Sequence, residues 1–204
     1  MSKLSSVGGY VAAAVLIVLG LGLAIAGFVG SSYVNSALAD EQIVGTPDMT
    51  PDAISAAIKE AGLTGVSAPS CTVAGEKVDT GMEAKCFADY MRIHTLEATG
   101  GKTYSQMPQY ATDDGKGTND KAAATKGPNG APVSNAARQI WVTETALTTA
   151  LNVSFFAGGV ALLAIVVGIA LLLVGIGFLV LISVASRRAA DPATQAEATK
   201  AVPA

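Results

Sequence analysis

Two long stretches of the sequence contain no charged side chain at all. The first lies between Lys3 and Asp40, and the second lies between Glu144 and Arg187. A charged group at the centre of a bilayer costs about 2.5–3.5 kcal/mol on insertion scales, so charge-free runs of this length are typical of lipid-exposed helices. The region 31–152 holds 23 of the 29 charged residues. The pattern predicts a mainly α membrane protein, in which a two-helix transmembrane hairpin carries a small, mostly helical domain.

The predicted transmembrane helices cover residues 9–30 and 153–184. The first gives a helix of about 33 Å, close to the roughly 30 Å of a hydrocarbon core. The second is longer, so it must tilt or project beyond the lipid. The alternative is that the first helix is a signal peptide cleaved between Ala39 and Asp40. We expect it to be retained, because its apolar region exceeds the roughly 7–15 residues usual for a signal peptide.

Basic residues next to the predicted membrane helices set their orientation. Lys3 precedes the first helix and Arg187 follows the second, whereas the flanks facing the middle of the chain are acidic. The positive-inside rule therefore places residues 1–8 and a disordered tail at 185–204 in the cytoplasm. It places the domain at 31–152 on the extracytoplasmic side.

Small residues recur at intervals of seven on one face of each predicted membrane helix. The set, including the neighbouring Ala24, is Ala13, Gly20, Ala24, Gly27, Ala161, Gly168 and Gly175. Small side chains let helices approach closely, and packing drives their association in lipid. We expect these stripes to close the hairpin, although a general glycine bias of membrane helices is the alternative. Neither helix contains an Asp, Glu, Lys, Arg or His. Proton relays and most transporters need such side chains inside the membrane.

The domain between the membrane helices is predicted to contain three helices, near residues 50–61, 82–99 and 134–152. Thr50 provides an N-cap for the first, and the second ends at two consecutive glycines. Residues 105–132 are rich in turn-forming types and predict a long loop. No Gly or Pro separates the third helix from the second membrane helix, so the two are expected to be continuous.

The two cysteines of the chain, Cys71 and Cys86, both fall in the predicted extracytoplasmic domain. An even number of cysteines in an oxidising compartment favours a disulfide. In the chain-entropy model, a disulfide that closes a loop of about 15 residues stabilises the folded state by about 3 kcal/mol. Two buried free thiols are the alternative. Two cysteines and one histidine without clustered spacing do not form a zinc pattern, and we expect no metal and no cofactor.

Catalytic motifs are not recognisable in the sequence. The single histidine, His94, has a helical position typical of a structural hydrogen-bonding group, and non-haem iron oxygenases need two histidines and a carboxylate around one metal. The net charge of −3 and the lack of a basic patch argue against nucleic-acid binding. If the domain binds a ligand, the predicted pocket lies between the second and third helices near His94, Tyr104 and Trp141.

A family resemblance rests on the sequence His-Thr-Leu-Glu-Ala-Thr-Gly-Gly-Lys-Thr-Tyr at residues 94–104. Together with Leu-Ala-Asp-Glu-Gln-Ile at 38–43 and a Thr/Ala/Leu-rich entry to the last span, it resembles small actinobacterial two-span membrane proteins of unknown function. These proteins are often labelled aromatic ring-opening dioxygenases. The resemblance covers about half of the chain and implies an actinobacterial plasma membrane. The label implies dioxygenase chemistry, which the residues of this sequence do not support.

Three functions are compatible with these features. The preferred prediction is a non-enzymatic accessory, scaffold or oligomerising subunit of a cell-envelope membrane complex, whose partners are the lipid bilayer and other membrane subunits. The second is an extracytoplasmic ligand-binding or sensing module. The third is an enzyme whose site is shared between subunits, for example through a metal held by several copies of His94.

Overall fold

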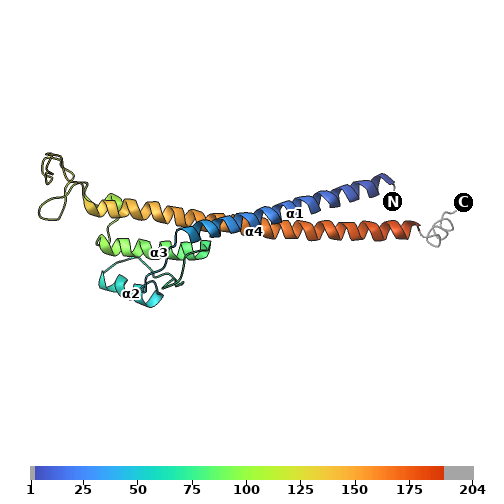
Figure 1. Ribbon diagram of the computed structural model, residues 1–204, viewed down its shortest axis with the longest axis horizontal. Coiled ribbons are helices and arrows are strands. Elements are labelled where there is room, and N and C mark those ends of the chain that lie inside the picture. The colour runs from blue at the N-terminus through green and yellow to red at the C-terminus, as the bar shows by residue number, and fades with distance from the viewer. Residues whose placement is uncertain (1–2, 191–204) are drawn as a thin grey trace. The chain divides into compact units, whose positions relative to one another are not determined.

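The computed structural model describes residues 3–190 and is mainly helical (Figure 1). Its elements are α1 (Lys3–Asp40), α2 (Pro51–Glu60), α3 (Gly81–Ala98), the short 3₁₀ helix η1 (Tyr104–Gln106) and α4 (Ala136–Ala190). Over these residues the only β pairing consists of isolated bridges, and no strand forms. The predicted helical fold class is therefore confirmed.

The chain divides into two compact units. One unit consists of Met1–Ser32 and Gly159–Ala204, and its described part is called the helix pair below. The other, Tyr33–Gly158, is called the central unit. The helices α1 and α4 are both long and apolar enough to cross a membrane, which confirms the prediction of two such helices.

Both long helices extend beyond their predicted membrane segments. Helix α1 continues past residue 30 to Asp40, and α4 is unbroken from Ala136, so nothing separates the predicted third helix from the second membrane segment. The prediction of a disordered tail is corrected for residues 185–190, which are helical. Alanine favours helix there, and the basic side chains of the last turn complement the negative end of the helix dipole. The rest of that tail, 191–204, lies outside the described residues, as do residues 1–2.

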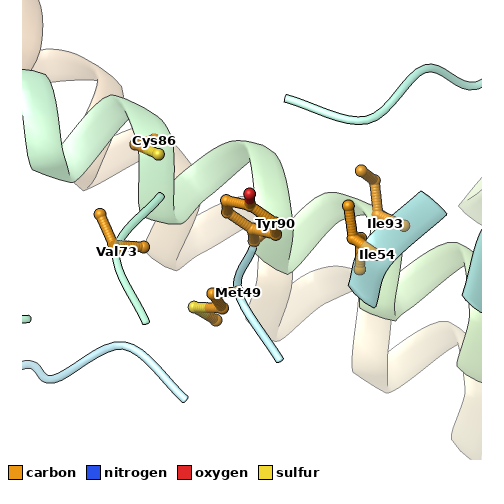
Figure 2. Packing of buried hydrophobic residues seen from close by; sticks show 6 residues of the cluster. All are labelled: Met49, Ile54, Val73, Cys86, Tyr90 and Ile93. Carbon is orange, nitrogen blue, oxygen red and sulfur yellow. The ribbon is translucent and has the colours of Figure 1, made fainter. Parts of the chain in front are cut away.

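The main core of the central unit forms where α2 and α3 pack together (Figure 2). Its buried residues are Met49, Ile54, Val73, Cys86, Tyr90 and Ile93. Tyr90 is fully buried, and its hydroxyl donates a hydrogen bond of 2.6 Å to the carbonyl oxygen of Cys71. Burial raises the pKa of Tyr90 above its ordinary value. The tyrosine therefore ties the irregular segment before α3 to the middle of that helix.

A capping box begins α3. The Thr80 hydroxyl accepts a hydrogen bond from the backbone N–H of Glu83, and the Glu83 carboxylate accepts one from the backbone N–H of Thr80 and another from that of Asp79. Burial raises the pKa of Glu83, but these hydrogen bonds outweigh it, and the pKa lies below its ordinary value. This reciprocal arrangement satisfies N–H groups that a helix start leaves without partners.

A second core cluster joins the end of α1 to α3 and α4 within the central unit. Its buried residues are Leu38, Val78, Ala84, Ala88 and Leu151. Leu38 and Leu151 come from the long helices, so these two helices supply part of the hydrophobic core of the central unit. Helix α1 ends at Asp40, two residues after its contribution to this cluster.

Candidate functional site

The small-residue stripes face each other in the helix pair, where α1 and α4 run antiparallel. A Cβ atom added to Gly168 would lie 2.5 Å from the backbone nitrogen of Ala24 and 2.6 Å from the carbonyl oxygen of Gly20. An added Cβ at Gly20 would in turn lie 2.6 Å from the carbonyl oxygen of Gly168. The backbones are therefore so close at this level that only glycine fits on either helix.

Two further levels flank this contact, one toward each end of the helix pair. An added Cβ on Gly27 would lie 2.6 Å from the carbonyl oxygen of Ala161, and one on Gly175 would lie 3.1 Å from that of Ala13. Ala13 is fully buried, and Ala24 and Ala161 are nearly so. The structure thus brings all seven residues of the two stripes together, in three levels separated by seven residues on each helix.

Most large apolar side chains of the helix pair point away from this contact, whereas Ile17, Ile165 and Leu172 pack beside the glycines. The outward side chains include Val11, Val18, Leu19, Ile25, Phe28, Val29, Leu162, Leu163, Val166, Leu173, Val180 and Leu181, all of which are more than half exposed. Gly22, Gly159 and Gly177 also lie outside the contact, because an added Cβ at these positions would meet no atom within 4 Å. The closest contacts of the helix pair are therefore made by small residues, and most of its large apolar residues are outside.

Cys71 and Cys86 form a disulfide, with their Cα atoms 6.1 Å apart. The prediction of this bond is confirmed. It joins the irregular segment before α3 to the second turn of α3, and Cys86 is buried in the core that contains Tyr90. The cross-link and the Tyr90 hydrogen bond therefore hold the same segment.

Of the three residues predicted to line a pocket, Tyr104 and Trp141 lie together. They line an open hollow of about 560 Å³ on the side of α4. The indole N–H of Trp141 donates to the carbonyl oxygen of Lys102 at 2.8 Å and to the hydroxyl of Thr99 at 3.3 Å. Trp141 is buried, so its ring contributes to the core and its polar edge fastens α4 to the end of α3.

Two arginines cover these aromatic rings. The guanidinium carbon of Arg138 lies 3.9 Å from the centre of the Tyr104 ring, and that of Arg92 lies 5.3 Å from the centre of the Trp141 ring. Both distances are within the range of cation–π attraction. Neither arginine was part of the predicted pocket. In the sequence, the only sign that Arg138 lies near the pocket is its helical spacing from Trp141. The position of Arg92 over the Trp141 ring could be found only from the tertiary fold.

His94 does not line the hollow that contains Tyr104 and Trp141. Its Nε2 lies 3.4 Å from a carboxylate oxygen of Asp48, and its Nδ1 lies 3.5 Å from one of Glu97. A hydrogen bond from Thr46 is the main cause that lowers the pKa of Asp48, and His94 adds a smaller contribution. Among the residues searched, no group of three or more metal-binding side chains is arranged to hold an ion. His94 is therefore a partly exposed side chain between two carboxylates, and its Nε2 atom is itself buried and makes no hydrogen bond to the residues that the structure describes.

No family model, curated protein or solved structure matches the chain.

Proposed function

We propose that this protein is a two-span membrane protein that acts as a non-enzymatic accessory or scaffold subunit of a cell-envelope complex, either with other proteins or with copies of itself. The observation that carries the proposal is the inverted packing of the helix pair, with glycines inside and large aliphatic side chains outside. Such an exterior is unfavourable in water and suits lipid or neighbouring membrane helices. Two helices that close on each other through glycines keep their outer faces available.

The outer glycines favour a subunit over a hairpin surrounded only by lipid. Gly22 on α1 and Gly177 on α4 present open backbone, where a further helix can approach as closely as the two helices approach each other. Close approach matters more in lipid than in water, because burial of apolar surface gives no net gain between helices there.

We place the protein in the plasma membrane, with both termini in the cytoplasm and the central unit outside. The disulfide supports this orientation, because such bonds persist in oxidising compartments. The position of basic residues beside the long apolar runs supports it as well.

Native mass spectrometry after extraction in several mild detergents tests the proposed assembly. We expect a defined oligomer or a stoichiometric complex with other membrane proteins. The variant Gly177→Leu should weaken that assembly without opening the helix pair, whereas the outward change Leu181→Val serves as the matched control. A lone monomer in every mild detergent would refute the proposal.

Labelling with a membrane-impermeant maleimide tests the orientation. Lys116 is exposed in the loop of the central unit, so a cysteine at this position should react on intact cells. An added cysteine at Ser186, beside the basic pair of α4, should react only after the cells are lysed. The opposite pattern would overturn the orientation.

A further inference from the structure

A long groove runs between α3 and α4 in the central unit. It consists of two hollows of about 580 and 450 Å³ that share the side chain of Met91. The hollows follow one another along α4 from Ser154 to Ala136, and the end of α1 forms a wall of the larger one at Leu38. With a rise of 1.5 Å per residue, the groove is about 27 Å long, or about five helical turns.

The wall that α4 contributes is a ridge with heptad spacing. Steps of four and three residues alternate along its members, which are Ala136, Ile140, Thr143, Leu147, Ala150 and Ser154. Ile140 is 41% exposed and Leu147 is 50% exposed. The opposite wall on α3 consists of Phe87, Met91 and Thr95, each one turn from the next. The heptad spacing of the α4 wall is the pattern by which helices accept the side chains of another helix.

A buried carboxylate lies in this groove. Glu144 is only 5% exposed, yet it lines the smaller hollow. Its carboxylate accepts one hydrogen bond, of 3.2 Å, from the hydroxyl of Thr145. No Lys or Arg forms an ion pair with it in the part of the chain that the structure describes. A buried charge is costly unless a cation or several hydrogen-bond donors accompany it, so Glu144 is suited to an external cation.

We propose that this groove binds an amphipathic α-helix of another protein, with apolar side chains against the α4 ridge and with Lys or Arg opposite Glu144. A second carboxylate, that of Glu41, lines the larger hollow, and no basic residue lines either hollow. The charge of the groove is therefore uniformly negative while its walls are largely apolar. An amphipathic helix in a hydrophobic groove, anchored at heptad-spaced positions, is a recurrent mode of peptide recognition.

The same observations disfavour a second copy and a lipid chain as occupants. Two copies joined through this groove would offer each other only carboxylates, from Glu41 and Glu144, and like charges destabilise such a contact. A hydrocarbon chain would leave Glu144 without a cation. A flexible hydrocarbon chain also has no repeating shape that would match a ridge with heptad spacing over five helical turns.

The inference deepens the proposed function, because it names the contact through which a partner protein would join the central unit. A defined probe tests it: a 21-residue helical peptide with Leu and Ala in heptad positions and Lys beside them. The matched peptide carries Glu in place of every Lys. Binding of each peptide to the full chain in phosphatidylcholine nanodiscs is measured by fluorescence anisotropy, with empty nanodiscs as the blank.

The Lys peptide should bind at least about tenfold more tightly than the Glu peptide, and Glu144→Gln should weaken the Lys peptide about tenfold. Glu144→Lys should reverse the preference. Leu147→Asp should abolish binding, whereas Val142→Asp, at a similarly exposed position on α4 outside the groove, should not. The exposed carboxylate of Glu60 lies outside the groove, so Glu60→Gln should also leave binding unchanged.

Equal affinity for the two peptides, or Lys-peptide binding that survives Leu147→Asp, would overturn the inference. A stoichiometric lipid that is released by Leu147→Asp, with no peptide bound, would show a lipid site instead and would also overturn it. Native mass spectra of the same samples separate the two proposals. An intact assembly without peptide binding refutes the groove alone, and a peptide-binding monomer refutes the proposed subunit alone.

Discussion

The helix pair and the central unit use opposite rules to pack the same kind of secondary structure. In the helix pair, glycine and alanine make the closest contacts, and most Leu, Ile and Val side chains face outward. In the central unit, large side chains such as Tyr90 and Ile54 are buried, and polar side chains face outward. In water, large apolar side chains gain most from burial, whereas in lipid they gain little and close backbone approach matters more. The contrast is the one expected if the helix pair spans the membrane, as proposed, and the central unit lies in water.

The contrast predicts its largest effect at Gly168. The variant Gly168→Leu should destabilise the helix pair by about 3 kcal/mol or more, because the added side chain would meet backbone atoms that cannot rotate away. Gly159→Leu, where an added Cβ has open space, is the matched control and should have little effect. Reversible unfolding in SDS mixed micelles measures both. Equal destabilisation by the two variants would break the comparison.

The disulfide should stabilise only the central unit. Replacing Cys71 and Cys86 together by alanine should cost about 3 kcal/mol, as expected for the loop that they close. Hydrogen exchange should accelerate in the segment between them and in α3. The amides of the helix pair should exchange at unchanged rates, and acceleration there would show that the two units do not behave as separate packing regions.

Trp141→Phe should have an intermediate effect of about 1–2 kcal/mol, because the Lys102 carbonyl and the Thr99 hydroxyl lose their donor while the aromatic ring is kept. Tyr104→Phe is a suitable control, since Tyr104 is much more exposed and its ring can still stack on Arg138. Urea denaturation of the protein in detergent compares the two. A larger loss from Tyr104→Phe would contradict the role given to Trp141.

The smallest effect concerns pH and the start of α3. The pKa of Glu83 is lower in the folded state than its ordinary value near 4.5. Its contribution to the free energy of unfolding is therefore fully present above pH 4.5 and is lost as the pH falls through the folded-state pKa. The loss should be below about 1 kcal/mol, the size of a typical cap. Glu83→Gln should flatten this part of the stability profile between pH 6 and pH 3. A variant profile as steep as that of the wild type would exclude Glu83 as its source.

Local signals in the sequence were sufficient for much of the helical architecture. The Thr50-Pro51 start and the charge-free runs predicted helices that the structure contains at α2, α1 and α4. The two cysteines also predicted the disulfide, since two cysteines allow only one pairing within the chain. The resemblance to actinobacterial two-span proteins stays a prediction.

Tertiary relations were much less accessible. His94 was expected beside Tyr104 and Trp141, but its neighbours are Asp48 and Glu97. Helical spacing within α3 does not predict how α3 packs against the segment that precedes it. Glu144 was counted only as a flanking charge. Its burial depends on how α4 meets α3, and a single carboxylate in a polar stretch of sequence gives no sign of this.

Spin-label accessibility in liposomes tests the central claim most directly. Cysteines introduced at Val18 and Leu163, which are outward on the helix pair, should be highly accessible to oxygen and poorly accessible to a water-soluble nickel complex. A cysteine at Ala24, in the glycine contact, should be protected from both. High accessibility of Val18 and Leu163 to the nickel complex would contradict the account, because it would place the outer faces of the helix pair in water.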